Sequence, residues 1–343
     1  MILKPLVRPA RATASGHLVA GLLAGLFCVC RGAVDEAPGT PGRELVRDPR
    51  FTRGFHLLDP TPGRRVVDGR LAPTGREIEP VWDLAQWSSR FPLGPGPAAE
   101  SEHGAARWAN AAKTVTLGGD GTNRADLSLA VHASREYAAG ARKSGEPWVH
   151  LLVQQNFTNP PSRDEIATAR LRLEVRLVKS RLHRTPDYTP ELHAAQYQMF
   201  LTLQNSNRRS QGFGRFVWFG IPLYDDRARI PPEHKQRDTA GSDMFIYTPA
   251  GDLFSPRSAH DGEWIQVDCD LRPLLIEALE TAWRRGFLDE SRDLADYRLT
   301  GMNLGWEVPG VFDVEMGVRG LSLVVTSGGH TTAETAHGRE HAR

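Results

Sequence analysis

The sequence predicts an all-β protein, an antiparallel β-sandwich of jelly-roll type with one late amphipathic helix. Many short segments alternate apolar and polar residues, and this period of two is typical of strands with one buried face. Turn signals rich in Gly, Pro and Asp separate the segments at fairly even spacing, as in sandwiches and barrels. No repeated strand–helix–strand units are visible, so a parallel α/β sheet is not expected.

The best-defined element is a predicted hairpin between Gln196 and Asp226. The apolar side of its two strands consists of Tyr197, Met199, Leu201, Leu203, Val217, Phe219, Ile221 and Leu223. We expect this side to face the core. The opposite side combines amides with aromatic rings, which is unusual for a face that is only solvated; it carries Gln198, Phe200, Thr202, Gln204, Phe216 and Trp218.

The other elements follow from the same pattern and from helix signals. Asp270 is a candidate N-cap, Pro273 suits a first helical turn, and Gly286 ends an apolar helical repeat. A weaker helical turn is expected at 288–296. Strands are expected at 51–58, 65–71, 115–117, 126–133, 148–155, 169–178, 244–248, 264–271, 297–307 and 312–326, with 79–91 either a strand or an extended segment.

The chain divides into four predicted parts. Residues 1–33 resemble a signal peptide, because a basic start precedes the apolar run Leu18–Cys30 and small residues follow. Residues 34–50 read as a Pro/Gly-rich linker, 51–326 as the sandwich domain and 327–343 as a disordered tail. The protein is therefore expected to be secreted or periplasmic, of bacterial type, with no membrane segment after cleavage. Cys269 would be the cysteine left after cleavage, and we expect it to be buried.

Composition excludes some partners. The chain has 343 residues and a formal net charge of +1 from 42 basic and 41 acidic residues. This balance indicates no general attraction to nucleic acid or to an acidic membrane surface. No phosphate-binding loop, nucleophile elbow or zinc motif is present.

A binding surface is predicted if the strands of the alternating segments are neighbours in one sheet. Its side chains would be guanidinium, carboxylate, amide and aromatic groups, a mixture suited to sugar hydroxyls and to the apolar faces of sugar rings. The alternative is a solvated face with cross-strand ion pairs. The residues are His150, Gln154, Arg172, Glu174, Arg176, Gln198, Thr202, Gln204, Phe216 and Trp218.

The segment Arg172-Leu-Glu-Val-Arg176 resembles the R-x-E-[LV]-R strand of jelly-roll alginate lyases. The resemblance implies a strand in a substrate groove, with arginines that hold uronate carboxylates. It covers five residues. The family's Gln-[Ile/Val]-His strand is absent, Gln196-Tyr-Gln198 being the nearest string, and so is its Tyr-x-Lys-x-Gly-x-Tyr-x-Gln strand. Because the missing His and Tyr would transfer the proton, polysaccharide binding is expected before lyase activity.

Three functions stay open: polysaccharide binding, polysaccharide degradation by a lyase or a glycoside hydrolase, and a structural role. A glycoside hydrolase would need two carboxyl groups in one groove; Glu307 is the most isolated carboxyl, although an ion pair with an Arg at a turn is its simpler interpretation. A structural module that binds protein is the third reading. No cofactor is expected; Ca²⁺ is conceivable only at Asp225-Asp226 and in the loop 119–122.

Overall fold

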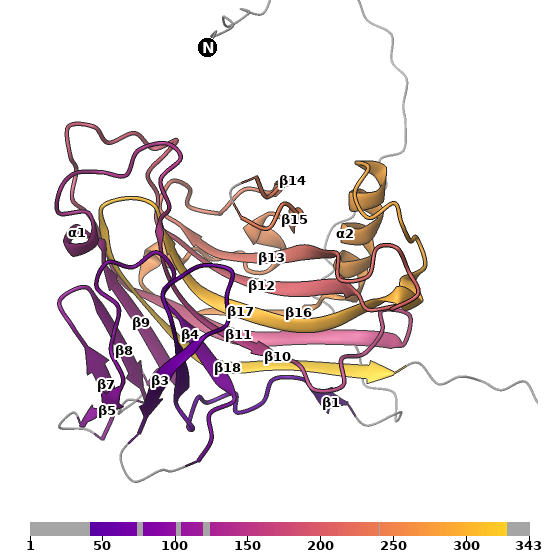
Figure 1. Cartoon of the computed structure of the whole chain (residues 1–343), viewed down its shortest axis with the longest axis horizontal. Coiled ribbons are helices and arrows are strands. Elements are labelled where there is room, and N and C mark those ends of the chain that lie inside the picture. Colours follow the sequence, from indigo (N-terminus) through magenta and orange to yellow (C-terminus); the bar gives the residue numbers. More distant parts are fainter. Residues whose placement is uncertain (1–41, 74–77, 101–103, 119–123, 240, 328–343) are drawn as a thin grey trace, which may run out of the picture.

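The computed structural model describes residues 42–73, 78–100, 104–118, 124–239 and 241–327. Two sheets pack face to face, as predicted for a jelly-roll-type sandwich (Figure 1). The eight-stranded sheet contains β16 (Ile265–Asp270), β11 (Ile166–Leu182), β18 (Phe312–Ser327), β9 (Leu127–His132), β8 (Lys113–Leu117), β7 (Ala106–Ala109) and β6 (Ala99–Glu100) in this order, and β1 (Arg43–Glu44) pairs with β18.

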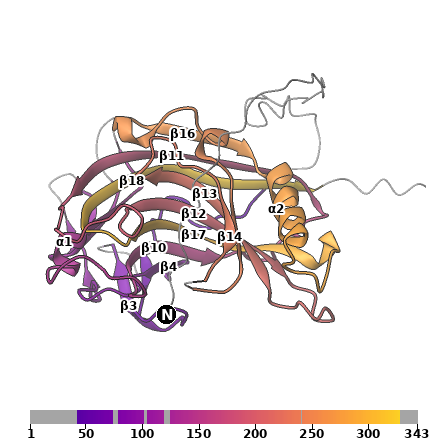
Figure 2. The same cartoon turned by 90° about the horizontal axis from the view of Figure 1, so that it is seen from above.

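The second sheet has ten strands. Their order is β14 (His234–Arg237), β15 (Phe245–Thr248), β13 (Phe216–Asp225), β12 (Gln196–Asn205), β17 (Tyr297–Val308), β10 (Val149–Asn156), β4 (Trp82–Ala85), β2 (Phe55–Leu58), β3 (Val67–Ala72) and β5 (Gly96–Pro97). Seen from above, β16, β11 and β18 form one layer and β12, β17, β10 and β4 the other (Figure 2). Most neighbours are antiparallel, but β13–β15, β2–β4 and β3–β5 are parallel pairs.

The predicted hairpin is β12 paired with β13, and its inner face is core as expected. Tyr197, Met199, Leu201 and Leu203 are fully buried, while the residues between them are half-buried. Side chains from both sheets fill the interior, including Trp306 and Phe219 of the ten-stranded sheet and Met316 of the eight-stranded sheet. Cys269 is buried in β16 as predicted.

The predicted late helix is α2 (Arg272–Arg284), with Pro273 in its first turn. It contacts β11 of one sheet and β13 and β15 of the other, so it covers the sandwich at one edge (Figure 1). Leu271, rather than Asp270, is the N-cap residue, but the Asp270 carboxylate accepts the Arg272 N–H. Gly286, with φ of 75°, follows the C-cap residue Arg285, since this left-handed conformation favours glycine.

Several short elements were not predicted. They are α1 (Ala133–Glu136), the strands β5, β6, β7 and β14, and the 3₁₀ turns η1 (Gly251–Leu253) and η2 (Ala259–Asp261); the weak helical turn is η3 (Leu294–Asp296). Part of the predicted linker 34–50 also differs: β1 pairs with β18, and Leu45 and Val46 are buried in the core. Burial of Leu45 and Val46 stabilises this arrangement, because removing apolar surface from water is favourable. The backbone next to these residues can then pair with β18.

The predicted leader 1–33 and residues 328–343 of the predicted tail lie outside the described residues; Ser327 is the last residue of β18. Within the described part of the chain, no helix has the length and apolarity needed to cross a membrane.

Candidate functional site: the outer face of the ten-stranded sheet

Strand order divides the predicted binding surface between the two sheets. His150, Gln154, Gln198, Gln204 and Trp218 belong to the ten-stranded sheet, but Arg172, Glu174 and Arg176 lie on β11 of the eight-stranded sheet. The assumption that all these strands are neighbours is therefore wrong. Alternation places each set on the outer face of its own sheet, so the two sets point to opposite sides of the sandwich.

The five residues of the ten-stranded sheet share one face, together with Thr202 and Phe216. Register pairs them into rows across β10, β17, β12 and β13. One row is Gln154, Asn303, Phe200 and Gly220, and the next is Asn156, Gly301, Thr202 and Trp218. Non-glycine side chains paired in this way lie about 5 Å apart at Cβ, so they are neighbours on one side of the sheet, which we call the amide face; Gly220 and Gly301 add no side chain to it.

A polar row of His150, Glu307, Gln196 and Asp225 crosses four adjacent strands at one end of the amide face, where β12 begins and β13 ends. Glu307 Oε2 accepts a hydrogen bond from Trp148 Nε1 at 3.2 Å and lies 3.6 Å from His150 Nε2. Gln196 Nε2 donates to Asp225 Oδ2 at 2.8 Å. The simpler sequence interpretation, an ion pair between Glu307 and an Arg at a turn, is therefore wrong: the partners of Glu307 are Trp148 and His150.

Glu307 is kept ionised by its neighbours. Burial by itself disfavours the charge, but the hydrogen bonds from His150 and Trp148 and the charge of His150 hold the pKa of Glu307 below its ordinary value. Its side chain remains 22% exposed. A carboxylate of this kind accepts hydrogen bonds from hydroxyl groups.

One aromatic cluster adjoins the polar row, and a second lies farther along the same face, with Trp218 opposite Thr202, six residues along β12 from Gln196. In the first cluster Trp148 stacks on His150 with ring centroids 5.7 Å apart, and Trp87 meets the same imidazole edge-on. In the second cluster Trp218 packs against Phe200 and Phe216. Trp218 Nε1 donates to Ser242 Oγ at 2.9 Å, which holds the indole in place.

The arginines of β11 are engaged in cross-strand pairs on the other sheet. Arg172 Nε lies 3.5 Å from Asp268, which also accepts two hydrogen bonds from Arg170. Glu174 pairs with Arg319 at 2.6 Å, and Arg176 donates to the carbonyl of Gly262. This is the solvated face with ion pairs that was the alternative interpretation of the predicted surface.

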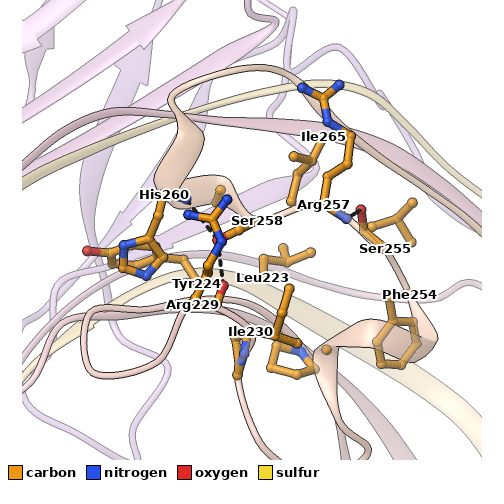
Figure 3. A pocket seen from close by; sticks show the side chains of 15 residues that line it. Leu223, Tyr224, Arg229, Ile230, Phe254, Ser255, Arg257, Ser258, His260 and Ile265 are labelled. Atoms are coloured by element: carbon orange, nitrogen blue, oxygen red, sulfur yellow. Dashed lines mark hydrogen bonds between the residues drawn. The ribbon is translucent and has the colours of Figure 1, made fainter.

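Two cavities of the described chain are lined by none of the four residues of the polar row. One is enclosed by the end of β13, η2 and nearby loops, where His260 lies against Tyr224 and Ser258 donates to Arg229 (Figure 3). Its free volume of about 10 Å³ holds one water molecule and is too small for a sugar. The other is a shallow depression beside Glu174 and Arg319 on the eight-stranded sheet.

No metal centre is formed by the residues described: no three His, Cys, Asp or Glu side chains are placed to share an ion. Asp225 is instead bonded through both carboxylate oxygens to Arg227. Although burial opposes ionisation, this guanidinium holds the pKa of Asp225 below its ordinary value. The loop 119–122 lies outside the described residues.

The sequence pattern does not identify several residues of the amide face as candidate site residues. The sequence pattern places Trp148 at the start of a strand and Trp87 in an edge segment, and it does not single out Gln196 or Asn303 as site residues. Alternation from the buried Trp306 places Glu307 on the outer side. That signal was available, but nothing local indicated that β10 and β12 lie on either side of β17.

Comparison with known proteins gives remote structural similarities only. The sequence matches no protein-family model and no curated protein. The endoglucanase Cel12A from Rhodothermus marinus is 11% identical with a TM-score of 0.34, covering 65% of this chain and 92% of its own. The family 11 xylanase from Neocallimastix patriciarum is 7% identical (TM-score 0.33; 65% and 91%). The xyloglucanase domain of NopAA from Sinorhizobium fredii, in complex with cellobiose, is 10% identical (TM-score 0.33; 70% and 100%). At these values the similarities do not assign an activity to this chain.

Proposed function

We propose that this chain is a secreted or periplasmic protein that binds a neutral polysaccharide on the amide face. The observation that carries the proposal is the row of His150, Glu307 and Gln196 beside the Trp148 ring, with a second aromatic cluster at Trp218 farther along the same face. Amide and carboxylate groups bind the hydroxyls of a sugar, and indole rings cover its C–H faces. The predicted signal peptide at 1–33 supports a secreted or periplasmic location.

The charge of the amide face favours a neutral ligand over a uronate polymer. Its central ionised group is Glu307, which repels carboxylates. The arginines that the resemblance to alginate lyases would assign to uronate binding, Arg172 and Arg176, are on the opposite side of the sandwich. The lyase alternative therefore loses the residues that suggested it.

Binding is favoured over hydrolysis by the surroundings of Glu307. Its register neighbours are His150 and Gln196, neither of which is a carboxylic acid. Asp225 lies two strands away, roughly 9–10 Å by strand spacing, and is already paired with Arg227. A glycosidase needs one carboxyl group that stays protonated as the general acid. The pKa values of Glu307 and Asp225 are both lowered, and Asp226, whose pKa is raised, accepts a hydrogen bond from the Ala195 N–H.

The test is a pull-down and calorimetry panel with cellulose, xylan, xyloglucan and mixed-linkage glucan, and with alginate and pectin as acidic counterparts. We expect binding to at least one neutral glycan with no change in its chain length. Glu307→Ala and Trp148→Ala should each weaken binding roughly tenfold or more, as for the loss of a hydrogen bond to a charged group. The matched control is Glu315→Ala, because Glu315 is a half-buried carboxylate on the other sheet.

Each of the other outcomes would support a different function. Chain shortening of a neutral glycan would indicate a hydrolase, and new ultraviolet absorbance with alginate would indicate a lyase. No binding across the panel, combined with concentration-dependent self-association, would favour a structural module and overturn the proposal.

A further inference from the structure

Arg142 is a buried cation close to the amide face but not part of it. The residue is 8% exposed. Its guanidinium donates to three backbone carbonyls: those of Lys143, Glu146 and Leu192, at 3.2, 2.7 and 3.0 Å. Burial lowers the pKa of Arg142. Placing a charge here costs free energy that carbonyl groups offset only in part, so the position calls for an explanation beyond packing.

The guanidinium lies on the ring of Trp148. Arg142 Cζ is 5.2 Å from the ring centroid, within the range of a cation–π contact. The same indole donates from Nε1 to Glu307 and stacks on His150. Arg142 thus contacts Trp148, and Trp148 contacts the polar row of His150, Glu307, Gln196 and Asp225.

Arg142 is itself held by a second loop. Thr189 N–H donates to His193 Nδ1 at 2.9 Å, so His193 carries its proton on Nε2, which donates to the Arg142 carbonyl at 2.7 Å. His193 is fully buried. The Arg142 guanidinium also donates a hydrogen bond to the Leu192 carbonyl. Backbone and side chain therefore tie the segment before β10 to the segment before β12.

We propose that Arg142 is a positioning residue for the bound glycan: it fixes the indole of Trp148 and, through that indole, the direction in which Glu307 accepts hydrogen bonds. This inference rests on the proposed function for its ligand but not for its geometry. Without the guanidinium, the Trp148 ring loses its support on one side, and Nε1 is no longer held toward the carboxylate. Arg142 acts only through Trp148 and touches no sugar.

The variants are Arg142→Met, which keeps the length of the side chain, and Arg142→Lys, which keeps a cation but lacks the planar guanidinium that stacks on an indole. The control is Arg319→Met, because Arg319 makes a similar contact with an indole, 4.1 Å from the ring of Trp264, on the eight-stranded sheet. Affinity for the best neutral glycan is measured against pH. The Glu307 carboxyl is titrated separately by carbon-13 NMR without glycan. The titratable group that faces Glu307 is His150 from β10, while β12 presents Gln196.

We expect Arg142→Met to weaken binding about tenfold and to raise the pH at which Glu307 titrates, since Glu307 loses a donor. Arg142→Lys should shift both in the same direction by less, and Arg319→Met should shift neither. Wild-type titration of Glu307 in a folded Arg142→Met or Arg142→Lys protein overturns the inference. So does weaker binding at every pH with an unshifted titration, which would mean a purely structural role. A wild-type protein that binds no glycan overturns the proposed function, while the NMR titration still decides the role of Arg142.

Discussion

Glu136→Gln tests the buried ion pair that anchors one side of the amide face. Lys113 on β8 and Glu136 on α1 form a salt bridge in which both side chains are 0% exposed. Glu136 also accepts hydrogen bonds from Ser89 Oγ and from Arg90 N–H, both at 2.7 Å. The pair therefore holds the segment that follows Trp87, whose ring packs on His150.

The magnitude follows from what the substitution leaves behind. Glutamine retains the size of the side chain and can keep bonds to Ser89 and Arg90, but the Lys113 ammonium loses its counter-charge in a site without solvent. Breaking one partner of a buried pair costs about 3–5 kcal/mol. For a large domain each kcal/mol lowers the melting temperature by about 2 °C, so a decrease of roughly 6–10 °C is expected.

The assay is urea unfolding followed by tryptophan fluorescence, with thermal unfolding alongside. The control is Glu280→Gln, which removes an exposed i,i+4 pair with Arg284 at 3.7 Å and should change stability by no more than about 0.5 kcal/mol. A loss below about 1 kcal/mol for Glu136→Gln would show that Lys113 is not a buried charge and would refute the reasoning. Lys113→Met combined with Glu136→Leu should recover much of the loss, because no charge is then left unpaired.

Three further predictions can be checked with the same samples. Leu201→Ala should destabilise the fold by about 2–5 kcal/mol in urea unfolding, because Leu201 is fully buried between the sheets; a loss near zero would contradict the core placement. Arg172→Ala should leave glycan affinity unchanged in calorimetry, because Arg172 lies on the other sheet, and a marked loss would restore a binding role for β11. Burial, with the charge of Asp225, raises the pKa of Asp226 to about 6. The folded protein therefore holds a proton that the unfolded chain has released between about pH 4 and 6. Stability from this group falls as pH rises through that window, and Asp226→Asn should gain stability relative to wild type from pH 4 to 6; a constant difference would refute the assignment.

Much of the local structure follows from the sequence because it depends on neighbours along the chain. Alternation of Tyr197, Met199, Leu201 and Leu203 with polar residues is a property of one strand, and it predicts which side chains are buried whatever the strand pairs with. The helix before Gly286 is predictable for the same reason. The pairs in the candidate site are different: His150, Glu307 and Gln196 are far apart in sequence and meet only through β10–β17–β12 pairing.

The sequence by itself thus determined the all-β class, the faces of the long strands and the late helix. Only the tertiary structure decided that β11 pairs with β16 and β18 while β10 and β12 flank β17. Both sheets of a sandwich show the same alternation, so the pattern of β11 cannot reveal which sheet contains it. For that reason Arg172, Glu174 and Arg176, which looked like partners of Gln198 and Trp218, lie on the opposite side of the molecule, and Trp148 and Glu307 take their place beside His150.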